Sequence, residues 1–425
     1  MNHRLRVRRT AWIALSCALL ALSACGPTED EIQLAPYLAA STPYSADNTG
    51  DVVVTVTGAY FQTGANLLLQ RPSDGALIHA RDVTVTGGTT VSGTFTLTGS
   101  PTALCDVIVM NPDSRTGRLS SAFQITQPTV LYAAGDFGRD VSAFHHANTL
   151  TGAAVPDRRL THAVLGQPGA VLLDATRNLL YVTDWPAGEV HVFADGASVD
   201  GGAAPLRTIT SSAYAGSFDG LALDEARNEL YVASYTHGVV LVFAAASASG
   251  DTVPVRVISG AALQNVRGLC LDTANNRLYA CRGGESGGAI HVFDLASSRN
   301  GEVAPSRTIT GPLLASMLEY VWVDPYSDRL YATLPSFGRL LCYDRVSILN
   351  GEVAPSVVIT LPGQPAGIWQ DSLRNILYVA DYAGGVAGAG AIWVFDAALT
   401  MTSAAQPART ITGLTSPKGL WGTNI

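Results

Sequence analysis

Charged side chains recur at one position of a repeating unit of about fifty residues. Aligned on the turn that follows, this position holds in order Gly169, Asp219, Arg267, Glu319, Ala366 and Lys418. Opposite charges on neighbouring repeats can pair with one another, or they can orient a polar ligand. A metal ion is disfavoured, because the two cations would repel it. The sequence therefore predicts either an internal salt-bridge ring or a contact for a polar ligand.

A second group of polar and aromatic residues lies in the loops that follow the Leu-Tyr pairs of the repeats. Its members are Asp184, Trp185, Tyr235, His237, Arg282, Asp381 and Tyr382, with Asp136, Arg139, Glu285 and Phe337 in equivalent loops. Aromatic rings can stack on a ligand while acids and guanidinium groups orient it. This set would suit a sugar, a peptide or a small polar molecule. The alternative is that these are ordinary surface-loop residues that bind no ligand.

Motifs for catalysis are weak. The run Gly284-Glu285-Ser286-Gly287-Gly288 matches G-x-S-x-G, but a nucleophile elbow needs a turn from a strand into a helix, and this run falls between antiparallel strands. His191 and His291 occupy the same repeat position, so we interpret them as pattern residues and not as a catalytic pair. We therefore expect no catalytic residue, no metal site and no cofactor.

Three markers define the repeat and predict its strands. Tyrosines of the Leu-Tyr pairs are Tyr132, Tyr181, Tyr231, Tyr279, Tyr331 and Tyr378. Aromatics that end the next strand are Phe144, Phe193, Phe243, Phe293, Tyr343 and Phe395, and each precedes a proline, at Pro156, Pro205, Pro254, Pro305, Pro355 and Pro407. Each unit thus contains four short strands, which is typical of a propeller blade that must stack on its neighbours to bury its faces.

The ends of the repeat region predict how the ring closes. The region opens with the Leu131-Tyr132 strand but has no apolar strand before it, and it ends with Lys418-Gly419-Leu420-Trp421, a first strand without successors. The C-terminal strand should complete the first blade, because closure satisfies backbone groups at strand edges. We predict an all-β chain in which residues 128–425 form a six-bladed β-propeller with 3+1 strand closure.

Two further patterns recur in the blades. Pairs of the form Asp-x-x-x-Asn/Asp precede the Leu-Tyr strands, as at Asp174 and Asn178, and we interpret them as side chains that cap turns and not as calcium ligands. Arginines follow the prolines, and we expect them to form a solvated rim, with binding of an anionic surface as the alternative: Arg158, Arg207, Arg256, Arg307 and Arg409.

Residues 33–127 carry short alternating strands separated by turn residues, which predicts a small β-sandwich. The stretch from Val56 to Phe61 and the run from Val107 to Asp113 resemble the TIG/IPT immunoglobulin-like module. That resemblance implies a spacer or contact domain of a surface or extracellular protein.

The repeat region as a whole resembles NHL-type and lactonase-like six-bladed propellers. That resemblance implies a ligand-binding scaffold or a hydrolase or lyase, and fold alone does not choose between them. Lactonase-like members hold a metal with Glu, Asn and Asp at the tunnel, whereas Arg267 and Lys418 stand in the corresponding ring here. We expect a non-catalytic binding protein. The alternatives are a hydrolase or lyase that uses Asp184, Asp381, Glu319 or His237 around a cation, and a purely structural envelope protein.

The N-terminus has the pattern of a signal peptide. Arginines precede an apolar run from Ala11 to Ala24, and Leu22-Ser23-Ala24-Cys25 resembles a lipobox. The resemblance implies cleavage after residue 24, a lipid on Cys25 and a spacer at 25–32. Gly26 indicates the outer membrane. An ordinary cleaved signal and an uncleaved anchor are the alternatives.

Composition limits the partners and the redox chemistry. The chain has 42 glycines and only 14% charged residues, which favours turn-rich β structure. Its formal net charge is −8, so we expect no nucleic-acid partner. The expected partners are the membrane, through the N-terminal lipid, and a protein, peptide or carbohydrate ligand. We expect Cys105, Cys270, Cys281 and Cys342 to be buried free thiols.

Overall fold

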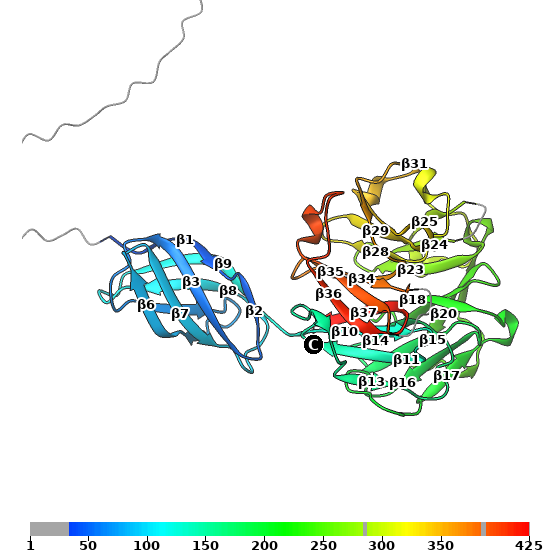
Figure 1. Cartoon of the computed structure of the whole chain (residues 1–425), viewed down its shortest axis with the longest axis horizontal. Coiled ribbons are helices and arrows are strands. Elements are labelled where there is room, and N and C mark those ends of the chain that lie inside the picture. The colour runs from blue at the N-terminus through cyan, green and yellow to red at the C-terminus, as the bar shows by residue number, and fades with distance from the viewer. Residues whose placement is uncertain (1–33, 284–286, 384–387, 425) are drawn as a thin grey trace, which may run out of the picture. The chain divides into compact units, whose positions relative to one another are not determined.

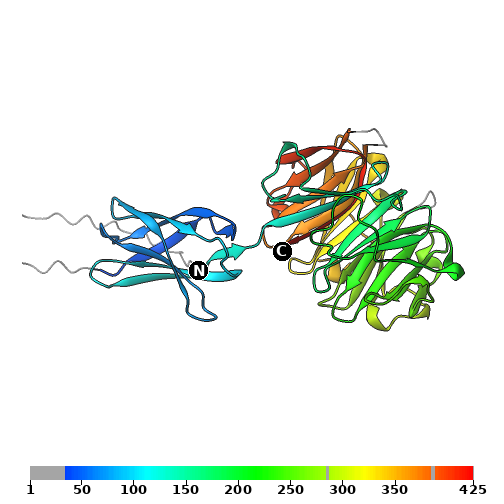
Figure 2. The ribbon, with the colours of Figure 1, turned by 90° about the horizontal axis from the view of Figure 1, so that it is seen from below.

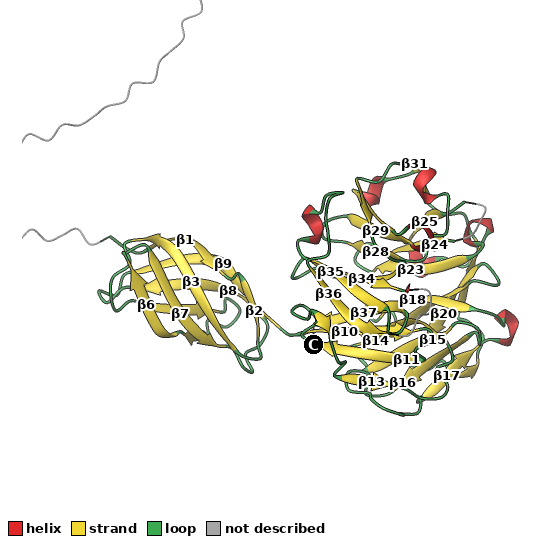
Figure 3. Cartoon of the chain, viewed as in Figure 1, coloured by secondary structure: helices red, strands yellow, loops and turns green. Residues whose placement is uncertain are grey.

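The computed structural model describes residues 34–283, 287–383 and 388–424. These residues form two compact units, built of strands and turns with a few short 3-10 helices (Figure 3). No helix in these three ranges is long and apolar enough to span a membrane.

The N-terminal unit is a β-sandwich. One sheet has the order β1 (Tyr37–Thr42), β3 (Asp51–Ala59), β7 (Thr90–Thr96), β6 (Arg81–Thr86). The other has the order β2 (Ser45–Asp47), β9 (Thr116–Thr126), β8 (Ala103–Met110), β4 (Asn66–Gln70), β5 (Leu77–His79). Alternate side chains such as Val54, Phe95 and Val107 are fully buried, as expected between two packed sheets. The sandwich is thus confirmed, while its TIG/IPT assignment stays a prediction.

The second unit is a ring of six sheets, which we number as blades in chain order (Figure 1). From the inner to the outer strand, blade 1 is β37 (Pro417–Asn424), β10 (Thr129–Gly135), β11 (Asp140–His145) and β13 (Arg158–Leu160). Blade 2 is β14 (Pro168–Asp174), β15 (Leu179–Asp184), β16 (Glu189–Phe193) and β17 (Arg207–Thr210). Blade 3 is β18 (Phe218–Asp224), β19 (Glu229–Ser234), β20 (Val239–Ala244) and β22 (Arg256–Ser259).

The remaining blades repeat the same order. Blade 4 is β23 (Val266–Asp272), β24 (Arg277–Arg282), β25 (Ala289–Asp294) and β27 (Arg307–Thr310). Blade 5 is β28 (Val321–Asp324), β29 (Arg329–Leu334), β30 (Arg339–Asp344) and β32 (Val357–Thr360). Blade 6 is β33 (Pro365–Asp371), β34 (Ile376–Asp381), β35 (Gly390–Phe395) and β36 (Arg409–Leu414).

The ring closes through the C-terminal strand. β37 pairs antiparallel with β10, with Trp421 opposite Tyr132, and it contacts both β14 and β33. Figures 1 and 2 show β37 in red beside β10 in cyan. The expected 3+1 closure is confirmed.

Short parallel strands add links between blades that the repeat pattern did not reveal. Each is two residues long, lies in the loop before a blade's outermost strand, and pairs with the outermost strand of the preceding blade. They are β12 (Gly152–Ala153) on β36, β21 (Gly250–Asp251) on β17, β26 (Gly301–Glu302) on β22, and β31 (Gly351–Glu352) on β27.

A ring of small residues lets the innermost strands approach closely. It follows the charged position by one residue and consists of Ala170, Gly220, Gly268, Gly367 and Gly419, with Tyr320 as the exception. A Cβ on Gly220 would lie 2.4 Å from the carbonyl oxygen of Arg267, so a larger residue cannot fit without a shift of the backbone. Tyr320 extends from blade 5 to blade 2, where its hydroxyl donates a 2.8 Å hydrogen bond to the Gly169 carbonyl. This side chain therefore crosses the centre of the ring.

The turn pairs have the structural role expected of them. Asp174 accepts a hydrogen bond from the Arg177 amide at 2.9 Å. Asn178 has a left-handed backbone conformation and accepts from the Ala197 amide at 2.8 Å. Asp224 and Asp371 cap their turns in the same way.

The expected solvated rim of arginines is wrong. Arg207, Arg256, Arg307 and Arg409 are half-buried, and their guanidinium groups donate to backbone carbonyls of the next blade. Arg256, for example, donates to Ala296 and Arg299 at 3.0 and 2.7 Å. A guanidinium carries several donors, so it can satisfy loop carbonyls that the sheet leaves unpaired. These arginines therefore join neighbouring blades.

The four described cysteines are buried and free, as expected. Cys270 lies opposite Tyr279 and not opposite Cys281. Burial raises the pKa of Cys270 to about 12, so this thiol is an inert core group. His191 and His291 are also buried, and each contacts a threonine hydroxyl through Nδ1, as befits repeat-pattern residues.

Candidate ligand site at the propeller mouth

The four charged residues predicted from the repeat come together at one end of the innermost strands. Arg267 Nη1 lies 3.3 Å from Asp219 Oδ2 and 3.0 Å from Glu319 Oε1. Lys418 Nζ lies 3.6 Å from Asp219 Oδ1 and 3.8 Å from Glu319 Oε1. Two cations and two anions thus alternate in a network that we call the charge ring. All four are buried to a large degree, and Asp219 is only 1% exposed.

Mutual pairing sets the protonation states of the charge ring. Burial alone would lower the pKa of Lys418, but the charges of Asp219 and Glu319 outweigh it and raise that pKa. The pKa of Arg267 is raised for the same reason. Burial raises the pKa of Glu319 even though Arg267 and Lys418 oppose that shift. Both cations therefore stay charged, and each partner of the ring is held by an opposite charge.

Aromatic rings pack against the two cations. Lys418 Nζ lies 4.6 Å from the Trp185 ring centroid, and the Arg267 guanidinium lies 5.2 Å from it. Arg267 also lies 4.9 Å from the Tyr235 ring, which contacts Trp185 at 5.1 Å between centroids. Cation–π contacts of this kind favour the charged, desolvated cations.

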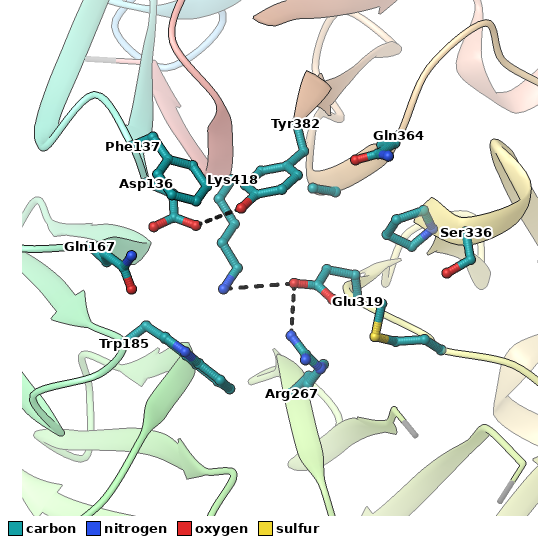
Figure 4. Close-up of a pocket in the computed structure, with 13 residues that line it drawn as sticks. Asp136, Phe137, Gln167, Trp185, Arg267, Glu319, Ser336, Gln364, Tyr382 and Lys418 are labelled. Carbon is teal, nitrogen blue, oxygen red and sulfur yellow. Dashed lines mark hydrogen bonds and ion pairs between the residues drawn. The ribbon is translucent and has the colours of Figure 1, made fainter. Parts of the chain in front are cut away.

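A cavity of about 370 Å³ opens above the charge ring (Figure 4). Its charged lining residues are Asp136, Arg267, Glu319 and Lys418. Its neutral polar residues are Gln167, Ser336 and Gln364, and its aromatic residues are Phe137, Trp185 and Tyr382. The volume lies within the range of small-molecule sites.

Asp136 lines this cavity with one carboxylate oxygen that has no hydrogen-bond partner among the described residues. Its Oδ2 accepts a 3.0 Å hydrogen bond from the Tyr382 hydroxyl, whereas its Oδ1 is buried and has no hydrogen-bond partner among the described residues. The side chain is only 7% exposed, and burial raises its pKa. Burial and the neighbouring Asp136 charge also raise the pKa of Tyr382, so its hydroxyl keeps its proton. A ligand donor at Oδ1 would satisfy this carboxylate.

Comparison with known proteins adds support at the level of the fold. No protein-family profile matches the sequence, and no curated protein matches it. Among solved structures, a chain of a nidogen/laminin complex is 16% identical with a TM-score of 0.50, covering 69% of this chain and 98% of that chain. The fold is that of a β-propeller.

Two further solved structures are similar at a lower level. A structural-genomics protein of unknown function from Bacteroides thetaiotaomicron is 13% identical over 92% of this chain and 93% of that chain, with a TM-score of 0.43. Hydrazine synthase of Kuenenia stuttgartiensis is 18% identical over 64% of this chain and 74% of that chain, with a TM-score of 0.43.

Several loop candidates of the propeller do not face the cavity. The Asp184 carboxylate accepts hydrogen bonds from the amides of Gly166 and Gln167 at 2.8 and 3.3 Å. Asp381 accepts from the amides of Gln364 and Ala383 at 2.9 and 3.3 Å. These two acids cap the loops that carry the two glutamines, so they position the lining.

Three more candidates lie outside the cavity lining. His237 contacts the Ala215 carbonyl at 2.8 Å and packs on Tyr214. The Tyr235 ring packs against the Trp185 ring and is not part of the cavity lining. Arg282 is the last residue of β24 and is also not among the described lining residues. Of the seven loop candidates, Trp185 and Tyr382 reach it directly.

The two glutamines were missed by sequence reasoning, although a signal was present. Gln167 and Gln364 each stand two residues before the charged position of their repeat, and Ser217, Asn265 and Ser416 occupy the same place in other blades. Comparing the repeats at the position two residues before the charged one would have revealed these recurring polar residues.

No group of three or more His, Cys, Asp or Glu residues suited to a metal ion occurs within the described ranges. The G-x-S-x-G match includes residues 284–286, which lie outside those ranges.

A second cavity of about 260 Å³ lies toward the turn ends of the innermost strands. Its lining is mainly apolar and includes Leu223, Leu271, Trp322 and Trp421. The rings of Trp322 and Trp421 pack edge to face, with 5.9 Å between their centroids. Tyr320 borders this cavity, while its neighbour Glu319 borders the charged one. The charged mouth and the apolar cavity thus meet at Tyr320.

Proposed function

We propose that this protein is a cell-envelope lipoprotein whose propeller mouth binds a polar ligand without transforming it. One observation carries the proposal: the charges of the ring neutralise one another, while Asp136 lines the cavity and its buried Oδ1 has no hydrogen-bond partner among the described residues. Unmet hydrogen-bonding capacity in a concave site favours a bound molecule with complementary groups.

The charge ring is poorly suited to proton transfer. A general acid or base needs a proton that it can exchange near the working pH, whereas Arg267 and Lys418 are held in the charged form and Asp219 pairs with both. Hydrolysis or elimination at the mouth is the second candidate function. Glu319 favours it, because burial raises the pKa of this carboxyl and it borders the cavity.

A binding screen tests the proposed function. The full chain is heated with neutral sugars, amino acids, dipeptides, simple amines or carboxylates at millimolar concentration, and the midpoint of thermal unfolding is recorded. At least one class should raise the midpoint of the wild type and have a smaller effect on Gln364→Ala. Gln406→Ala, an exposed glutamine outside the cavity, is the matched control and should respond as the wild type does.

Two results would contradict the binding proposal. One is a screen in which no class raises the midpoint. The other is steady turnover of lactones or esters by the full chain together with a stoichiometric metal, which would establish the hydrolase alternative in its metal-dependent form.

The anchor and the domain roles are part of the same proposal. We place the lipid on Cys25 and the protein at the outer membrane, with the β-sandwich as a spacer or contact module. The ligand is a protein, peptide or carbohydrate, and the negative net charge disfavours a nucleic acid. A purely structural envelope role, with the propeller flank or the sandwich face contacting another protein, is the third candidate. Recovery of the same envelope partners with and without residues 33–127 would favour the propeller over the sandwich as the contact.

Lipid attachment can be measured with a clickable fatty acid fed to cells that express the full chain. The wild type should become labelled and partition into the membrane fraction, and Cys25→Ser should lose the label. Cys17→Ser changes the other cysteine near the N-terminus and should keep it. Equal labelling of the Cys25→Ser variant would exclude this attachment site.

A further inference from the structure

We propose that the ligand of the mouth is a neutral carbohydrate, either a free sugar or the terminal sugar of a glycan. This inference rests on the proposed binding function and narrows it to one class of ligand. The argument uses the charges, the hydrogen-bonding groups and the aromatic rings of the cavity.

The charges of the cavity disfavour a charged ligand of either sign. A cation would meet Lys418 and Arg267, and an anion would meet Glu319 and Asp136, all of which line the same space. Like charges at close range in a desolvated site are repulsive. An apolar ligand would exclude water from these groups without replacing its hydrogen bonds, which is also unfavourable. A polar molecule without net charge is the class that remains.

The neutral polar groups require a ligand with many donors and acceptors. Asp136 Oδ1 can only accept while the carboxylate is ionised, and the amides of Gln167 and Gln364 can each donate and accept. Figure 4 shows these side chains and Ser336 around the cavity, with Lys418 reaching in among them. Sugar hydroxyls act as both donor and acceptor, so neighbouring hydroxyls of one ring can match a mixed lining of this kind.

Aromatic side chains supply the apolar contact that a sugar ring also needs. Phe137 lies next to Asp136 in the chain, is 50% exposed, and packs on Tyr382 at 6.1 Å between centroids. Trp185 lies on the other side of Lys418 in Figure 4, and its ring is engaged by the two cations. Phe137 is therefore the ring best placed to stack on the C–H face of a sugar, beside the carboxylate that would bind its hydroxyls.

Calorimetric titration of the full chain tests the inference. The probes are neutral monosaccharides and disaccharides, with a uronic acid and an amino sugar as charged counterparts. Neutral sugars should bind more tightly than either charged form. Asp136→Asn and Phe137→Ala should each weaken binding about tenfold or more, because each removes one kind of contact. Gln406→Ala should bind as the wild type does, and the thermal midpoint of each variant reports whether it is folded.

The outcomes separate this inference from the proposed function. Binding of amino acids, amines or carboxylates with no binding of neutral sugars would overturn the carbohydrate assignment and leave ligand binding at the mouth intact. Tighter binding of a charged sugar would also overturn it. Absence of binding by every probe class would overturn both proposals. A glycan array probed with the full chain distinguishes the sources, because binding to immobilised glycans without binding of free sugars would identify a glycan terminus.

Discussion

Deletion of residues 416–425 is expected to abolish the cooperative unfolding transition of the propeller. The deletion removes β37, which pairs with β10 along its length and contacts the innermost strands of blades 2 and 6. It also removes Lys418 from the charge ring and exposes the edge of β10. The propeller therefore loses its closing strand and part of its hydrophobic core. Thermal unfolding followed by circular dichroism, with limited proteolysis, measures the effect.

A smaller deletion provides the control. Removal of residues 424–425 leaves Lys418, Leu420 and Trp421 in place and should preserve the transition. If the chain without residues 416–425 melts at the same temperature and as sharply as the intact chain, the C-terminal strand does not close the ring.

The second large effect is expected from Arg267→Met. This change leaves Asp219 and Glu319 with Lys418 as the remaining partner in the charge ring. Removing one partner of a buried ion pair costs roughly 3–5 kcal/mol, because the other charge stays desolvated. Urea unfolding at neutral pH should show a loss of this size. The double variant Arg267→Met with Glu319→Gln should recover part of it, since only one anion, Asp219, then remains for Lys418 to balance.

The loss should depend on pH with a defined sign. The pKa of Glu319 in the folded protein is already raised by burial, and the charge of Arg267 holds it down. Without Arg267 that pKa rises further, so the folded variant binds more protons than the unfolded chain and loses stability as the pH rises through the new value. The deficit should therefore be larger at about pH 8 than at about pH 5. Arg345→Met, at an exposed arginine outside the ring, should show no such trend. A deficit that is equal at both pH values would contradict this account of Glu319.

Much of the fold could be predicted because its determinants recur within each repeat. The Leu-Tyr pairs and their spacing located the strands, and the unpaired segments at Leu131 and Leu420 indicated the closure. Alignment on the turns also placed Asp219, Arg267, Glu319 and Lys418 at one level, because residues at equal distance from a turn reach equal depth in equivalent strands.

Contacts between blades were much harder to predict. The outer-strand arginines were expected to be solvated, yet Arg256, Arg307 and Arg409 each pair with an acid of their own blade. Their guanidinium groups also donate to carbonyls of the next blade, which a single repeat does not contain. Asp184 and Asp381 were correctly placed in loops, but sequence does not tell whether a carboxylate turns into a cavity or caps its own loop. The path of Tyr320 across the ring depends on the small residues of the other blades and could not be read from its own repeat.

A crystal structure of the full chain grown with the neutral sugar that binds best would test the binding site most directly. Our account predicts that the sugar lies in the charged mouth, with a hydroxyl donating to Asp136 Oδ1 and its ring against Phe137. A mouth that stays empty at saturating sugar, or a sugar bound in the apolar cavity beside Trp322 and Trp421, would contradict it.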